Sequence, residues 1–146
     1  MSIVKIVAFK LGEEEYGLEI EQVQGIERLL PITRVPNAPA YVKGVINLRG
    51  NVTPVIDLRS KLGLGQAKYT DYSRIIIAKY EEVEMGLIVD ETSDVMDIQP
   101  DAIEAPSTLQ FNRDFFGGVA KIDGRLITLL KLPEFMKDTL GDTIKS

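Results

Sequence analysis

The sequence of 146 residues contains no cysteine, no histidine and no tryptophan. Without cysteine there is neither a disulfide framework nor a thiolate nucleophile, and an intracellular compartment is the plain interpretation. Without histidine the commonest general base and a principal zinc ligand are missing. Neither G-x-S-x-G nor G-x-x-x-x-G-K-S/T occurs, so the familiar hydrolase and phosphate-loop motifs are missing too. We therefore expect a protein that is not an enzyme and that has no cofactor and no metal.

Long hydrophobic runs and an excess of positive charge are also missing. No stretch of 18 apolar residues occurs, and the N-terminus does not have the layout of a signal peptide. Seventeen basic residues against 22 acidic ones give a net charge of −5 and a pI near 4.8. Nucleic acid and anionic lipid both attract basic surfaces, so this balance disfavours both as partners. We expect a soluble cytoplasmic protein that does not bind nucleic acid or insert into a membrane.

The most informative stretch runs from Val35 to Leu58. It opens with a proline-containing loop, which is followed by an apolar, β-branched run from Val45 to Arg49 that is typical of a strand. Gly50-Asn51 is a hairpin-turn signal, and Val52 begins the return strand. Arg49 would then lie just before the turn, where a long cationic side chain can leave the sheet and reach a partner.

Three more short strands are predicted upstream of this hairpin. The pattern of apolar runs and of period-2 alternation places them at Ile3–Leu11, Tyr16–Glu21 and Val23–Arg28. Residues 59–64 can form one helical turn, and 65–72 is polar and begins with glycine, as expected for a connector. Five strands within about 58 residues, joined by tight turns, favour a small barrel.

The second half of the sequence repeats the first. Ile6–Leu11 is similar to Ile75–Tyr80, and the Tyr16-Gly17 pair matches Met85-Gly86, each 69 residues later. Gly44, Gly50 and Leu58 match Gly118, Gly124 and Leu132, each 74 residues later, with the extra residues between Ile98 and Phe115. So many matches in register indicate an internal duplication.

The repeat predicts an all-β fold of two five-stranded barrels side by side, because one barrel of about 65 residues buries too little surface to be very stable alone. We assign the first barrel to residues 1–64, a connector to 65–72 and the second barrel to 73–131, together forming one domain. Residues 132–146 complete the chain as a tail. Within it, Leu132–Leu140 is predicted to form a short helix that covers a barrel end or edge, since its apolar residues share one face.

Candidate chemistry is sparse. The acidic residues Asp90, Glu91, Asp94 and Asp97 could bind a divalent cation or do acid–base work, but a solvated face on an acidic protein is the favoured interpretation. Tyr41, Phe115 and Phe116 are most simply packing aromatics.

Arg49 has two interpretations. It can form a salt bridge to Asp57 across the hairpin or to Glu27 on a nearby strand, which contributes little if exposed. It can equally offer its planar five-donor fork to a carboxylate or backbone carbonyl of a partner. The spacing alone leaves both interpretations open.

Three classes of function are compatible with these features. An interaction module with two binding surfaces is preferred, because a duplicated barrel offers two free ends and a groove. A small-molecule or metal-binding double barrel, with weak hydrolytic activity, is disfavoured by the missing histidine and cysteine. An RNA-binding barrel is disfavoured by the acidic pI.

Nearly the whole chain resembles the CheW family of bacterial chemotaxis coupling proteins. The motifs that carry the resemblance are Tyr16-Gly17, Ile32–Pro36, Gly44–Gly50 (GVINLRG), Pro54–Arg59 (PVIDLR), Gly86–Asp90, Val95 and the Gly118 region. The resemblance implies two SH3-like five-stranded barrels without enzymatic activity. It implies binding to the regulatory domain of the CheA histidine kinase and to the cytoplasmic tips of chemoreceptors, with other CheW copies as further partners. It also implies recruitment to membrane-associated receptor arrays.

Carried over by position, the resemblance implies a set of receptor-binding residues. For the kinase it implies contacts on barrel surfaces, with a loop of the second half as the candidate. The receptor-binding residues are Val23, Ile26, Val35, Gly44, Asn47 and Arg49. The kinase-binding residues are Ile103, Glu104 and Leu109. One position departs from the family pattern, since Gly25 stands where many members carry a glutamate. Glu27 lies two residues further along the predicted strand, on the same face, and is a candidate partner for Arg49.

Overall fold

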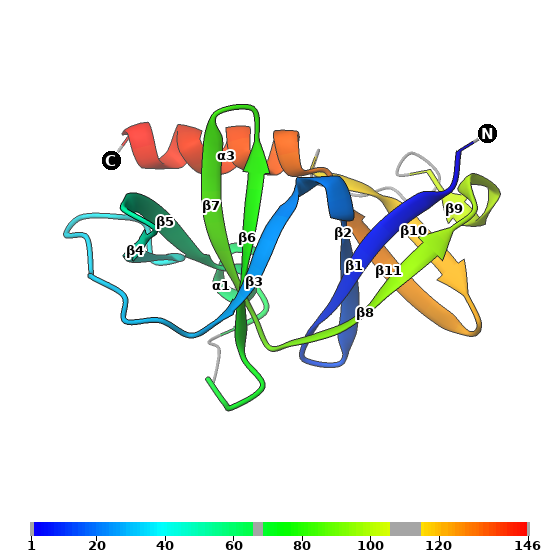
Figure 1. Cartoon of the computed structure of the whole chain (residues 1–146). Coiled ribbons are helices and arrows are strands. Elements are labelled where there is room, and N and C mark those ends of the chain that lie inside the picture. Colours follow the sequence, from blue (N-terminus) through cyan, green and yellow to red (C-terminus); the bar gives the residue numbers. More distant parts are fainter. Residues whose placement is uncertain (1, 66–68, 106–114, 146) are drawn as a thin grey trace.

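Short β-strands form two sheets that lie side by side, and a helix begins between them and runs along one of them (Figure 1). The computed structural model describes residues 2–65, 69–105 and 115–145, with side chains through 139. Each sheet curls into a small SH3-like barrel, so the predicted all-β fold of two barrels is confirmed.

The first barrel, which we call barrel A, contains a six-stranded sheet in the order β8-β1-β2-β11-β10-β9. Its strands are β1 (Val4–Leu11), β2 (Glu14–Glu19), β8 (Glu91–Ile98), β9 (Ile103–Glu104), β10 (Phe116–Ile122) and β11 (Arg125–Leu130). The second barrel, barrel B, contains a five-stranded sheet in the order β3-β6-β7-β5-β4. Its strands are β3 (Val23–Arg28), β4 (Val42–Leu48), β5 (Asn51–Asp57), β6 (Arg74–Tyr80) and β7 (Val83–Val89).

The two barrels do not follow the two halves of the sequence. In barrel A the hairpin β1–β2 of the first half lies between β8 and β11 of the second half. In barrel B the hairpin β6–β7 of the second half lies between β3 and β5 of the first. The assignment of one barrel to residues 1–64 and the other to 73–131 is therefore wrong at the level of strand pairing. Each half gives its first hairpin to the other half's barrel.

The internal repeat is nevertheless visible in the pairing. In each barrel the exchanged hairpin joins the other half through a parallel pair, β5 with β7 and β11 with β2. Gly44 and Gly118 occupy matching positions near the start of β4 and β10, both with positive φ. The 69- and 74-residue offsets therefore identify structurally equivalent residues.

The largest hydrophobic cluster is shared between the barrels. It combines Phe9 and Leu18 of barrel A with Ile56 and Leu87 of barrel B, all essentially inaccessible to solvent. Apolar residues along the interleaved strands therefore bury against the neighbouring barrel as well as within their own. Removing this area from water is the main stabilising contribution to the pairing of the barrels.

Four short helical segments complete the described chain. Single 3₁₀ turns, η1 (Ile20–Gln22) and η2 (Pro100–Ala102), precede β3 and β9. Helix α1 (Leu58–Lys61) begins after Asp57, whose carboxylate accepts a hydrogen bond from the Arg59 backbone N at 3.0 Å. Helix α3 (Leu132–Lys145) begins at the predicted residue and extends further than predicted.

Helix α3 packs on the shared core and runs along the outside of barrel B (Figure 1). It buries Leu132, Phe135 and Met136 in the largest cluster, and the Phe135 ring meets Phe115 edge-on, with centroids 5.4 Å apart. Because the helix starts at the end of β11 and crosses to barrel B, it ties the two barrels together. No helix among the described residues is long and apolar enough to span a bilayer.

Candidate functional site

The turn between β4 and β5 is formed by Arg49 and Gly50, one residue earlier than predicted. Leu48 pairs with Asn51 directly before and after it. Arg49 has φ 51° and Gly50 has φ 84°, the left-handed pair that two-residue hairpin turns require. Asn47 supports the turn, because its Oδ1 accepts a hydrogen bond from the Gly50 backbone N at 3.1 Å. Arg49 therefore lies at the tip of the hairpin rather than at the end of the strand.

Arg49 is an unusual residue for its backbone conformation. A left-handed φ is unfavourable for a long side chain, and such strain gathers at functional sites. The equivalent hairpin of barrel A places Asp123 there, with φ 49° followed by Gly124 with φ 78°. Aspartate tolerates this region and arginine tolerates it less well, so the arginine has no advantage for forming the turn.

The Arg49 guanidinium makes no ion pair with any residue that the structure describes. The proposed bridge to Asp57 is not formed, since that carboxylate is 1% exposed and accepts hydrogen bonds from the Arg59 backbone N and the Tyr69 hydroxyl instead. Glu27 is not paired with Arg49 either. Of the two interpretations of this arginine, the guanidinium offered to a partner agrees with the geometry.

Gly44 is needed for the fold. A Cβ atom at this position would lie 2.1 Å from the Thr33 backbone O, and its φ of 146° disfavours any other residue. The close approach arises because Val45 and Thr33 exchange two backbone hydrogen bonds of 2.8 Å, which close the barrel. Gly118 is equivalent, with the Glu104 backbone O 2.3 Å from its Cβ position. A substitution here therefore perturbs the fold before it perturbs a binding surface.

The other predicted receptor-binding residues differ in exposure. Ile26 is 43% exposed on the edge strand β3, and Val35 is 39% exposed in the loop before β4. Val23 is half-buried and packs against the shared core. The surface of barrel B thus presents Ile26, Val35 and the Arg49 turn to solvent, while Val23 and Gly44 support it from beneath.

Two of the predicted kinase-binding residues, Ile103 and Glu104, form β9. Ile103 packs partly against a small core cluster of barrel A, and the Glu104 carboxylate pairs with Lys121 Nζ on the neighbouring strand β10. Leu109 lies outside the described residues. The structure therefore brings Ile103 and Glu104 together on one edge of barrel A, away from the sheet of barrel B that carries the Arg49 turn (Figure 1).

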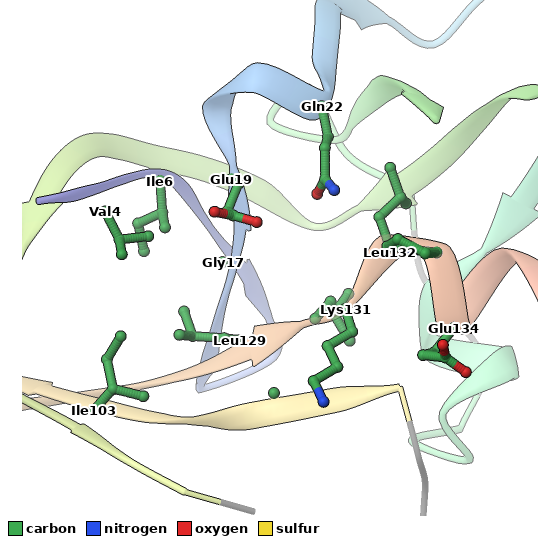
Figure 2. Close-up of a pocket in the computed structure, with 13 residues that line it drawn as sticks. Val4, Ile6, Gly17, Glu19, Gln22, Ile103, Leu129, Lys131, Leu132 and Glu134 are labelled. Carbon is green, nitrogen blue, oxygen red and sulfur yellow. The ribbon is translucent and has the colours of Figure 1, made fainter. Parts of the chain in front are cut away.

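Ile103 also lines a pocket of about 650 Å³ in barrel A, which the sequence did not predict. Figure 2 shows its apolar side formed by Val4, Ile6 and Leu129, with the Gln22 amide pointing into the space between Glu19 and Leu132. The Gln22 Oε1 atom is buried and has no hydrogen-bond partner among the residues that the structure describes. The pocket brings together residues of β1, β2, β9, β11 and α3, so no local sequence signal could have located it.

The acidic residues of the β8 region are used in structural contacts. The Asp90 carboxylate accepts hydrogen bonds of 2.7 Å from Arg59 Nη1 and from the Gly12 backbone N, which join the barrels. Asp97 pairs with Lys5. Asp94 pairs with Arg125, and the hydrogen bond from this guanidinium lowers the pKa of the Asp94 carboxyl. Within the described ranges no group of three histidine, cysteine, aspartate or glutamate side chains could hold a metal ion.

These features define a class of protein, a double SH3-like barrel whose exposed positions are suited to binding other proteins. Comparison with known proteins identifies the family. Residues 5–140 match the family model described as the CheW-like domain. The chain belongs to the CheW family.

Named relatives agree with this assignment over most of their length. The chain is 42% identical to the chemotaxis protein CheW of Bacillus subtilis over 86% of this chain and 82% of that protein. It is 38% identical to the chemotaxis protein CheW of Rhizobium meliloti, over 88% of this chain and 84% of that protein. Its fold matches the crystal structure of the scaffolding protein TtCheW from Thermoanaerobacter tengcongensis with a TM-score of 0.83 at 39% identity, covering 89% and 90% of the two chains.

Proposed function

We propose that this chain is a non-enzymatic chemotaxis adaptor that couples the cytoplasmic tips of chemoreceptors to the CheA histidine kinase. Its family and its resemblance to a scaffolding protein support this role. The single observation that carries the proposal is the exposed Arg49 at the tip of a hairpin, which forms no ion pair with any described residue and is held in a conformation unfavourable for arginine. We place the protein in the cytoplasm, recruited to receptor arrays, with other CheW copies as further partners.

The proposed receptor-binding surface lies on barrel B. Ile26 and Val35 supply apolar contact area, and Arg49 supplies a fork of hydrogen-bond donors. Asn47 holds the Arg49 turn in shape through its bond to Gly50 N. Val23 and Gly44 act from beneath, by packing β3 on the core and by closing the barrel.

The proposed kinase-binding surface lies on barrel A, at Ile103 and Glu104, together with Leu109. A regulatory domain of the same double-barrel fold would meet an apolar residue beside a charged pair there. Because the two surfaces lie on different barrels, both partners can bind at once, as an adaptor requires. The net charge of −5 supports neither nucleic acid nor lipid as an additional partner.

Single substitutions on each surface test this proposal. Ile26→Glu should weaken binding of a receptor-tip fragment and leave binding of the CheA regulatory domain unchanged, whereas Glu104→Lys should do the opposite. Lys121→Gln is the matched control, since it removes the same ion pair while keeping the Glu104 charge. Titration calorimetry with each partner separately provides the measurement, and circular dichroism checks the fold. If each folded variant loses both partners, the two-surface proposal is overturned.

A further inference from the structure

Two arginines face each other across the edge of barrel B. Arg28 of β3 and Arg74 of β6 are direct antiparallel neighbours. Side chains that are directly opposite in such a ladder lie on the same face of the sheet, and like charges in this arrangement are destabilising. A pair of this kind is unexpected in a protein whose net charge is −5.

In barrel A the equivalent pair of residues carries opposite charges. Shifted by the 69-residue repeat, Arg74 corresponds to Lys5 and Arg28 corresponds to Asp97. Lys5 and Asp97 are likewise direct antiparallel neighbours, on β1 and β8, and their side chains form an ion pair of 3.7 Å. Barrel A thus carries a cation and an anion where barrel B carries two cations. The anion of the pair is missing from barrel B.

No other acidic side chain that the structure describes takes its place. Arg74 Nη1 donates to the backbone carbonyls of Asp71 and Ser73, at 2.7 and 2.8 Å. Neither Arg28 nor Arg74 forms an ion pair within the described ranges. The carboxylate of Asp71 borders the same groove without pairing to either arginine. Within the described ranges, Nε and Nη2 of Arg74 and all the guanidinium donors of Arg28 have no acceptor.

The arginine pair lies in a groove that can hold more than a single ion. The groove has a volume of about 660 Å³ and is lined by Arg28, Arg74, Leu29, Tyr69, Thr70, Asp71 and Ser73. Leu29 and the half-exposed Tyr69 ring provide apolar surface beside the two cations. The Tyr69 hydroxyl is fixed by its hydrogen bond to the buried Asp57, so this wall of the groove is ordered.

From these contacts we infer that the Arg28–Arg74 groove binds a carboxylate on an acidic segment of a partner protein, and that this carboxylate takes the part Asp97 plays in barrel A. Guanidinium forks match the planar carboxylate in a bidentate manner, and the apolar walls suit an aliphatic neighbour in the same segment. A polyanion such as nucleic acid would meet the net negative surface beyond the two arginines, which favours a short acidic peptide. The inference does not depend on the identity of the adaptor's partners.

A pair of short peptides tests the inference. The probe Ac-Leu-Glu-Glu-Leu-NH₂ is titrated into the intact protein, and its neutral analogue Ac-Leu-Gln-Gln-Leu-NH₂ is the matched control. The Nε–Hε resonances of Arg28 and Arg74 in nitrogen-15 spectra should shift with the glutamate peptide alone. Arg28→Gln and Arg74→Gln should each weaken binding about tenfold, as expected for the loss of charge-assisted hydrogen bonds. Added salt should weaken binding as well.

A variant that supplies the missing anion gives an independent test. Arg28→Asp recreates in barrel B the cation–anion arrangement of Lys5 and Asp97, so it should abolish peptide binding while the melting temperature stays equal or rises. The reciprocal Asp97→Arg should lower the melting temperature, because it creates a second like-charged pair. Equal shifts with both peptides, equal shifts with inorganic phosphate, or no shift at millimolar glutamate peptide would each overturn the inference. So would a fall in melting temperature for Arg28→Asp.

Discussion

Arg49 occupies a backbone conformation that a smaller residue would adopt at lower cost. We therefore expect Arg49→Asn to leave the free energy of unfolding unchanged or to raise it by up to about 1 kcal/mol. The same change should reduce affinity for a receptor-tip fragment about tenfold or more, since it removes charge-assisted hydrogen bonds of roughly 1.5–3 kcal/mol. Urea unfolding and titration calorimetry measure the two effects.

The matched control for this prediction is Asp123→Asn, at the equivalent turn of barrel A. It should alter neither stability nor receptor affinity by much. A marked loss of stability in Arg49→Asn would mean that the arginine holds the hairpin, and the proposed role in binding would then be wrong.

Gly44 gives a second prediction for a single residue. Gly44→Ala should destabilise the protein by about 1–3 kcal/mol or more, because its Cβ would meet the Thr33 carbonyl and its φ disfavours alanine. Gly25→Ala is the control, since a Cβ at that position has no neighbour within 4 Å. Thermal melts of the two variants make the comparison, and similar melting temperatures would contradict the prediction.

Among the elements, strands β2, β8 and β11 are joined by Arg125, which binds Glu15 and Asp94 at 2.9 and 3.0 Å. The bound guanidinium lowers the pKa of Asp94, so the ionised form is favoured by folding. Stability from this interaction is therefore present above the ordinary carboxyl pKa of 3.8 and is lost as the pH falls through the lower folded-state pKa.

The lowered pKa of Asp94 leads to a third prediction. At pH 7, Asp94→Asn should reduce the free energy of unfolding by roughly 0.2–1 kcal/mol, the range for exposed ion pairs. The difference between variant and wild type should shrink as the pH falls below 3.8. Urea unfolding across this range measures it, and a difference that grows in acid would contradict the assignment.

Local sequence patterns predicted most strands and helices but did not predict which strands pair with each other. Alternating apolar residues located β2, and a glycine signal located the β4–β5 turn to within one residue. The turn was predicted one residue too late because arginine rarely adopts a left-handed φ, although Arg49 does so here. The parallel pairs β5–β7 and β2–β11 join distant segments, and no local propensity encodes them.

The receptor-binding role of the candidate site stays a prediction that follows from the family resemblance. Arg49 and Ile26 were identified by their positions in the family pattern, and both are exposed, as binding requires. The structural role of Gly44 depends on the distant Thr33 carbonyl, and the Arg28–Arg74 pair depends on the register of β3 with β6. Such features arise only when strands are paired, so a single sequence did not reveal them.

For the whole molecule, strand exchange predicts the behaviour of fragments. Neither residues 1–64 nor residues 65–146 should fold alone, because each contains the hairpin of one barrel and the remaining strands of the other. Mixed together, the two fragments should recover a dispersed nitrogen-15 spectrum and a cooperative melt. The intact chain is the control, and a fragment 1–64 that folds as a monomer would contradict the strand order described above.

The exchanged hairpins also bear on how a duplicated gene could yield two different binding surfaces. A polypeptide carrying one repeat would be unable to close its own barrel, and two copies would have to swap hairpins as an intertwined, twofold-symmetric homodimer. Every surface of that dimer would occur twice and be identical. Fusing the copies into one chain removes this constraint while keeping the interlocked fold, so the equivalent positions can mutate separately. Two sets of equivalent positions have diverged in this way. Arg49 of barrel B corresponds to Asp123 of barrel A, and the Arg28–Arg74 pair corresponds to the Asp97–Lys5 pair.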